Sequence, residues 1–138
     1  MSLHRTTLRD AARAALKANA RFVSFKFRKA WAQNIDTDGL PLISVATPGE
    51  LSKSVSRDAI QRQIEMSVII QRKGGDALED VADLDAEAAE TAVLTAIGPT
   101  AIDAQISQTD LRFSGEGASR VSTLDMRFSI LVMTDRET

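Results

Sequence analysis

Two long segments in which apolar and polar residues alternate are the feature that most restricts the fold of this chain. From Ile60 to Gln71 the even positions are mainly apolar and the odd positions mainly polar, and the pattern returns from Thr123 to Val132. Side chains of a strand point alternately to opposite faces, so this period of two predicts strands. Typical strands have about 5 to 6 residues, so the first is expected to extend beyond a compact core. We expect the two long strands to share one sheet.

Two further strands are predicted from shorter patterns. In "RFVSFKFRKAW", Phe25, Phe27 and Trp31 stand at even spacing, which favours an alternating strand. Residues 106–113 predict another, followed by a loop at 115–117.

The segment "DTDGLPLISVATPGELSK" predicts a turn, a buried strand and a second turn. Asp36, Asp38 and Gly39 supply turn chemistry, and Pro41 is suited to the start of a strand, where a missing N–H costs least. Residues 42–46 are expected to form a strand covered on both faces, which Pro48-Gly49 would end with a turn.

Two helices are predicted, one before the strands and one between them. The first covers residues 7–19, with Thr7 as its cap and Asp10 three residues later; its apolar positions are Leu8, Ala12, Ala15 and Leu16. The second runs from a cap at Asp83 to Ile97 and is ended by Gly98-Pro99. Its inward positions are expected to be Leu84, Ala88 and Ala92, flanked by Ala89, Val93 and Ile97, and its outward positions Asp85, Glu87 and Glu90.

The order of these elements predicts an α+β fold. We expect a mainly antiparallel or mixed β-sheet of about four to five strands, with two helices packed on one face. At 138 residues and 15.0 kDa, residues 1–138 are the size of a single domain. Residues 1–5 are expected to be mobile or an expression remnant.

The composition excludes several classes of protein. The chain has no cysteine, which rules out disulfides and thiolate chemistry, and its one histidine is His4. No apolar run approaches the roughly 20 residues that cross a bilayer, so no membrane partner is expected. No leader pattern precedes the chain, so a cytosolic origin is expected.

Catalytic and cofactor motifs are poorly supported, so we expect no enzyme, no cofactor and no metal. Asp36 with Asp38, or Asp80 with Asp83 and Asp85, could be proposed as cation ligands, but the first set lacks the later ligands of a calcium loop. The second lies where a helix begins, where its macrodipole already favours acids. Gly74-Gly75 lacks the lysine of a phosphate-binding loop. The serines considered as nucleophiles have no base except the distant His4; they are Ser44, Ser52 and Ser54.

Charge is distributed unevenly along the chain although the formal net charge is only −2. Residues 1–31 contain one acid, Asp10, and eight basic residues, which are Arg5, Arg9, Arg13, Lys17, Arg21, Lys26, Arg28 and Lys29. Residues 76–110 contain no lysine or arginine and nine acids, which are Asp76, Glu79, Asp80, Asp83, Asp85, Glu87, Glu90, Asp103 and Asp110. The net charge argues against general binding of nucleic acid, and no sequence-specific nucleic-acid partner is expected. Stacking of bases on Phe25, Phe27 and Trp31 is the alternative to core packing of these rings.

The order of the elements and several phrases resemble the tail terminator proteins of long-tailed phages, including the minor tail protein U type of lambda-like phages. "TTLRDAARAAL" resembles the opening helix of that family, and "GLPLISVATPGE" its Leu-Pro and apolar strand, here with Leu40, Pro41, Val45 and Glu50. The strand at 60–70, the helix after "DVADLDAE" and the closing "STLDMRFSILVMT" follow in the same order. Residues 53–57 and 76–83 have no counterpart, so no interface residue is carried over there.

The resemblance implies a structural protein of the virion tail, assembled in the bacterial cytoplasm. Such a subunit forms a ring with copies of itself, a hexamer in lambda-like members, on the end of the tail tube. The ring stops polymerisation of the tube protein and offers a surface to the head–tail connector. The alternatives are another head–tail connector, neck or tube-type protein, and a small-ligand-binding α+β module.

The uneven charge suggests how a ring could be held together. A ring needs heterologous contacts, in which one patch meets a different patch on the next copy. We expect the basic first helix and strand of one copy to face the acidic segment of its neighbour from Asp76 to Glu90. The candidate interface residues are Arg9, Arg13, Lys17, Asp80, Asp83, Glu87 and Glu90. Pairing of the same regions within one chain is the alternative.

Overall fold

The computed structural model describes residues 4–28, 40–115 and 120–135. Two helices, one 3-10 turn and five strands follow in chain order: α1 (His4–Ala18), η1 (Ala20–Phe22), β1 (Lys26–Arg28), β2 (Leu42–Ser54), β3 (Ala59–Gly74), α2 (Leu78–Ile97), β4 (Asp103–Ser114) and β5 (Arg120–Asp135).

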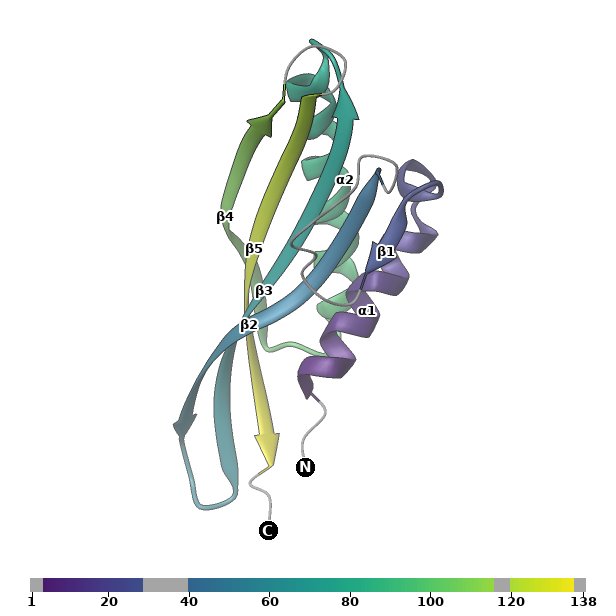
Figure 1. Ribbon diagram of the computed structural model, residues 1–138. Helices are drawn as coiled ribbons and strands as arrows, with labels where there is room; N and C mark the ends of the chain where they lie inside the picture. The colour runs from purple at the N-terminus through teal and green to yellow at the C-terminus, as the bar shows by residue number, and fades with distance from the viewer. Residues whose placement is uncertain (1–3, 29–39, 116–119, 136–138) are drawn as a thin grey trace.

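The five strands form one mixed sheet in the order β1-β2-β3-β5-β4. β1 runs parallel to β2, and every other neighbouring pair is antiparallel. The two strands with the longest alternation, β3 and β5, pair directly from Ala59↔Asp135 to Gly74↔Arg120. Both helices lie on the same side of the sheet (Figure 1). The expected α+β architecture is therefore confirmed.

The core lies between the two helices and the face of the sheet that they cover. Leu8, Ala12 and Leu16 form the buried stripe of α1, as their spacing predicts. On the sheet, apolar residues of β3 stand opposite those of β5, for example Met66↔Phe128 and Val68↔Met126. Alternation puts these side chains on one face, so the long strands supply most of the apolar surface that the helices bury.

The prediction that β2 ends at Pro48-Gly49 was wrong. Its pairing with β3 shifts register between Ala46 and Gly49, and the strand continues to Ser54. A bulge accommodates a proline in a strand because the ladder is already interrupted there. Pro41 stands just before the strand, as expected, while Asp36, Asp38 and Gly39 lie outside the described residues.

Both helix starts differ from the prediction. α1 is helical from His4, so Thr7 lies inside the helix rather than at its cap. α2 begins at Leu78, with Ala77 at its N-cap and no capping side chain, and Glu79 and Asp80 lie in its first turn. Asp83 is therefore inside the helix. Burial of Leu78 and Ala82 favours a helix that begins before Asp83, the residue expected to cap it. The stop at Gly98 is confirmed.

Of the predicted strand around Phe25 and Phe27, the described residues contain β1, Lys26–Arg28. Phe22 lies in η1, and its ring packs edge-on against Phe25 with centroids 5.1 Å apart. Both rings are buried, so they pack in the core and do not form a surface on which bases could stack. Trp31 lies outside the described residues. Of the predicted loop at 115–117, the structure describes Gly115, whose φ of 82° suits glycine.

The far ends of three strands project beyond the helices. We call this projection the arm; it consists of residues 49–63 of β2, β3 and their connection, together with residues 131–135 of β5. Figure 1 shows the hairpin and the end of β5 extending past the N-terminal end of α1. The expectation that the long strand reaches beyond the compact core is confirmed.

Candidate functional site

The exposed side of α2 carries negative charge that no described residue neutralises. Asp80, Asp83 and Glu87 are exposed, and Glu90 is half-buried. α2 contains no lysine or arginine, and within residues 4–28, 40–115 and 120–135 none of these four acids forms an ion pair. This acidic side of α2 is one candidate contact surface.

The basic candidates on α1 are engaged within the chain. Arg9 donates to Thr47 Oγ1 at 2.6 Å, and Arg13 donates to the Val45 carbonyl oxygen at 3.3 Å and to Asp10 at 3.1 Å. The Lys17 ammonium lies 5.3 Å from the centre of the Phe27 ring, a cation–π distance. These side chains tie α1 to β1 and β2, and among the described residues none forms an ion pair with the acids of α2.

A different residue links the basic front of the chain to the acidic segment. Arg21 Nε donates to Asp85 Oδ1 at 2.6 Å, and the side chain of Asp85 is only 1% exposed. Arg72 donates to the same carboxylate from β3 and stacks over Phe25, with 4.5 Å from guanidinium carbon to ring centre. The alternative to pairing between copies was pairing of the basic and acidic regions within one chain. Such a pairing is present between Arg21 and Asp85, neither of which is among the candidate interface residues.

The outward orientation predicted for Asp85 was wrong, as was the inward one for Leu84. Because α2 begins at Leu78, its buried stripe is Leu78, Ala82, Asp85, Ala89, Val93 and Ile97. Leu84 is 54% exposed, and Ala88 and Ala92 are only half-buried. The sequence contained a sign that Asp85 is buried, since it stands at helical spacing from the apolar residues Ala82 and Ala89. A carboxylate at such a position needs buried basic partners.

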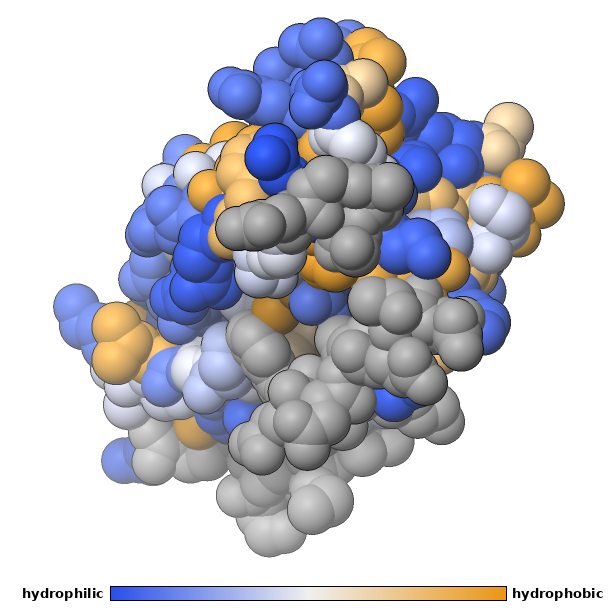
Figure 2. Space-filling view, turned by 45° about the horizontal axis from the view of Figure 1, so that its top comes forward, coloured by the Kyte–Doolittle hydropathy of each residue, from blue (hydrophilic) through white to orange (hydrophobic). Residues whose placement is uncertain are grey.

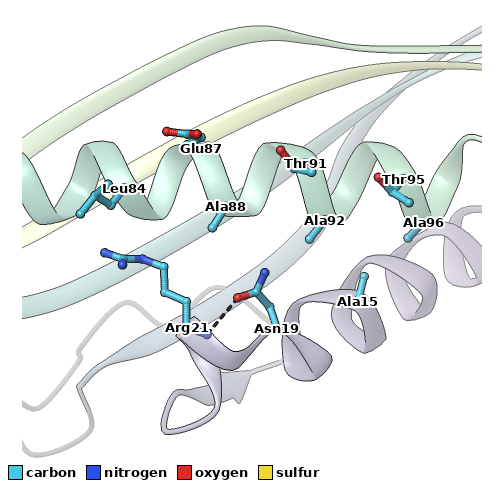
Figure 3. A pocket seen from close by; sticks show the side chains of 10 residues that line it. All are labelled: Ala15, Asn19, Arg21, Leu84, Glu87, Ala88, Thr91, Ala92, Thr95 and Ala96. Carbon is cyan, nitrogen blue, oxygen red and sulfur yellow. Dashed lines mark hydrogen bonds between the residues drawn. The ribbon is translucent and has the colours of Figure 1, made fainter.

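A groove of about 730 Å³ runs between α1 and α2 on the side away from the sheet. In Figure 3, Leu84, Ala88, Ala92 and Ala96 lie on the side of α2 facing α1, and Ala15 faces them from α1. Arg21 and Asn19 close one part of the groove, where the Asn19 side chain accepts from the Arg21 backbone N–H at 2.9 Å. Small side chains leave the space, and exposed Leu84 gives it an apolar end.

The arm presents a second, chemically different surface. On one of its faces, cross-strand pairing aligns Leu51, Gln63 and Leu131 in one row and Lys53, Gln61 and Met133 in the next. Leu51 is 75% exposed and Met133 46% exposed. Lys53 and, in the connection, Arg57 are exposed and without an ion pair in the described part of the chain. Asp58 in the connection and Asp135 at the end of β5 are exposed as well, so the arm is an apolar surface with exposed charges of both signs.

The base of the arm is fixed to α1 through Glu50. Its carboxylate is 2.7 Å from His4 Nε2 and accepts from Arg62 at 2.6 Å and from Ser52 at 2.9 Å. Burial of the Glu50 carboxyl raises its pKa, but hydrogen bonds from His4, Arg62 and Ser52, with the charge of His4, outweigh this and lower the pKa from 4.5 to about 2. The carboxylate thus stays ionised, and its bonds to His4 and Arg62 hold the base of the arm against α1.

The sheet face away from the helices is largely polar. Along β3 and β5 it carries glutamine, serine and threonine, with an ion pair of 2.9 Å between Glu65 and Arg127. Figure 2 shows hydrophilic residues over much of the face in view, with hydrophobic residues in separate small patches. Asp125 is buried on this side; its Oδ2 lies 3.6 Å from Arg127 Nη2, and its Oδ1 has no hydrogen-bond partner within the described part of the chain.

In the described part of the chain no three histidine, aspartate or glutamate side chains gather in a way that would hold a metal ion. Ser44 is buried in β2, Ser52 donates to Glu50, and Ser54 donates to the Ser56 carbonyl oxygen. No helix among the described residues is long and apolar enough to cross a membrane.

The fold has a counterpart among solved structures. No family model matches the sequence, and no curated protein matches it. The chain is similar in structure to one in the virion of a native gene transfer agent particle, with a TM-score of 0.57 and 15% sequence identity. The match covers 92% of this chain and 95% of that chain. At this identity, the match shows a shared fold.

Proposed function

We propose that this chain is a structural protein of a phage-like particle, and specifically a tail terminator. It would form a ring on the end of the tail tube, stop polymerisation of the tube and provide the surface that joins tail to head. The observation that carries the proposal is the shared fold with a virion chain over nearly the full length of both chains. The order of sequence phrases that resembles the tail terminator family supports the finer assignment.

The surfaces of the molecule suit a role in assembly. A ring requires two different patches on each copy, each meeting the other kind on a neighbour. The acidic side of α2 and the apolar arm, with its exposed Lys53 and Arg57, are two such patches at separate places on the fold. The function proposed here is steric, and it needs no catalytic group or cofactor. Another head–tail joining role is the second candidate, because the fold similarity supports it equally.

Tail tubes growing from the tube protein of the same particle provide the test. The purified chain is added during growth, and tube lengths and ends are examined by electron microscopy. A terminator is expected to give tubes that stop growing and carry added density at one end. Unchanged growth with no density at either end would contradict termination. Density at a tube end without an effect on length would favour the other head–tail joining role.

A further inference from the structure

We propose that the arm of one copy docks on the acidic side of α2 of the next copy, over the groove between α1 and α2. This inference rests on the proposed ring, and it names the contact that would build it. The occupant is a second copy of this chain, presenting the arm face that carries Leu51, Lys53 and Met133. The receiving surface carries Asp80, Asp83, Leu84 and Glu87.

Charge complementarity is the first argument for this pairing. Lys53 and Arg57 point from the arm into solvent, and Asp80, Asp83 and Glu87 do so from α2. None of the five has an ion-pair partner among the described residues of its own chain. The arm also exposes two acids, Asp58 and Asp135, so the complementarity belongs to Lys53 and Arg57 and not to the arm as a whole. The cations of α1 are poorer partners for α2, because Arg9 and Arg13 already donate to β2. Opposite charges on two surfaces steer their encounter and fix their register.

Apolar exposure is the second argument. Leu51 is 75% exposed, Val55 44% and Met133 46%, although large apolar side chains gain free energy by leaving water. On the other surface, Leu84 is 54% exposed beside a groove whose α2 wall is made of alanine and threonine with Glu87. Small residues in the groove leave room for the larger side chains of the arm. Apolar groups framed by charged ones are the usual anatomy of a protein interface.

The exposed stretch of the arm is short enough to lie within the length of the groove. From Leu84 to Ala96 the groove follows twelve residues of α2, or roughly 18 Å at 1.5 Å per residue. From Leu51 to Val55 the arm extends four residues, or roughly 13 Å at 3.3 Å per residue. The arm projects past the helices of its own chain (Figure 1), so these helices do not cover it and a neighbouring copy could contact it. Arm and groove are different patches, and their contact is therefore heterologous, as a ring requires.

Cross-linking tests the contact without background, because the chain has no cysteine. Two variants, Leu51→Cys and Ala88→Cys, are mixed and treated with a short bismaleimide, in concentrated solution and on capped tail tubes. The mixture is expected to form dimers at a yield about tenfold above that of either variant alone. The double variant is expected to form a ladder that ends at the ring size. Gly75→Cys mixed with Leu51→Cys is the matched control, because Gly75 is exposed outside the groove.

The outcomes separate this contact from the proposed function. Tubes capped by the wild-type chain but no Leu51–Ala88 product would overturn the contact and leave the terminator role standing. Efficient cross-linking of Leu51→Cys to itself would also overturn it, because the contact would then be isologous. Failure of the wild-type chain to cap tubes would reject the function, while cross-linking in solution would still decide the contact.

Charge exchange provides a second measurement on the same pair of surfaces. Lys53→Glu or Glu87→Lys alone is expected to weaken association roughly tenfold, because like charges would face each other. The double variant is expected to recover most of the loss. Lys73→Glu and Asp103→Lys are the controls, since both residues are exposed outside the two surfaces. Equal losses in the controls, or no recovery in the double variant, would overturn the pairing.

Discussion

Arg72 and Asp85 are joined by two hydrogen bonds, from Nε to Oδ2 at 2.6 Å and from Nη2 to Oδ1 at 3.0 Å. The pair connects β3 to the first half of α2, and Arg21 adds a bond of 2.6 Å to the same carboxylate. The proposed acidic contact surface belongs to this half of the helix. Its position on the sheet therefore depends on a buried charge network as well as on apolar packing.

Replacing Asp85 by alanine is expected to lower the free energy of unfolding by about 2 to 4 kcal/mol. The change leaves two guanidinium groups facing each other without their shared carboxylate. Their side chains are 28% and 23% exposed, so water recovers part of the loss. Denaturant titration measures the change. Asp83→Ala is the matched control on the same helix, expected within about 0.5 kcal/mol of wild type. Equal losses in the two variants would contradict the buried network.

The Glu50 cluster predicts a specific dependence of stability on pH. The folded pKa of about 2 lies below the ordinary value of 4.5, so this carboxylate stabilises the fold fully above about pH 5. The contribution is lost as the pH falls from 4.5 toward 2. The difference in unfolding free energy between wild type and Glu50→Gln should therefore shrink over that range. Denaturant titrations at a series of pH values measure it, and a constant difference would contradict the prediction.

Regular patterns made much of the fold predictable from the sequence. The alternation in residues 60–71 and 123–132 identified β3 and β5, because a strand buried on one face must repeat with period two. The spacing of Leu8, Ala12 and Leu16 identified the buried face of α1 for the corresponding reason. In both cases the local pattern and the tertiary contacts require the same side chains to be buried.

Features set by long-range contacts were not predictable in this way. Pro48-Gly49 is a strong local turn signal, yet pairing with β3 carries β2 through it as a bulge. Asp85 is polar, yet Arg21 and Arg72 from distant parts of the chain make its burial favourable. The apolar face of the arm was not predictable for the same reason. Leu51 and Leu131 come into one row only when β2, β3 and β5 pair in register.

Asp125 offers a substitution that is expected to stabilise the protein. Its Oδ1 is buried without a hydrogen-bond partner among the described residues, and its Oδ2 lies 3.6 Å from Arg127 Nη2, a long ion pair. In the β4–β5 pairing Asp125 stands opposite Asp110. Like charges directly opposite each other destabilise a sheet, and an unsatisfied buried oxygen adds a desolvation cost. Asp125→Thr should therefore raise the free energy of unfolding by about 1 kcal/mol, since threonine also favours strands. Arg127 retains its ion pair with Glu65 in the variant.

The check for Asp125→Thr is a thermal or denaturant unfolding curve beside that of Asp135→Thr. Asp135 is an exposed residue at the end of the same strand, so its replacement is expected to have little effect. A destabilised Asp125→Thr variant would show that this carboxylate has a favourable role on the sheet face.

Association of the chain should weaken as salt is added, if the arm and the acidic side of α2 form the contact. At 0.15 M ionic strength the Debye length is about 8 Å, and at 0.01 M it is about 30 Å, so exposed charges attract over a longer range in dilute salt. Sedimentation at several salt concentrations measures the effect. Wild type should show a clear decrease in association, and Lys53→Glu a weaker decrease. Identical salt dependence in the two proteins would argue against a role for Lys53.

Leu51→Ser should separate folding from assembly. Leu51 is 75% exposed, so its replacement is expected to change the free energy of unfolding by less than about 0.5 kcal/mol. In the docked arm this side chain would be buried, which contributes about 1.5 to 3 kcal/mol and corresponds to a loss of tenfold or more in association. Val23→Ser is the matched control, because Val23 is 78% exposed but lies outside the arm and the groove. Sedimentation and tube capping should detect a defect in Leu51→Ser alone, and equal behaviour of the two variants would remove Leu51 from the contact.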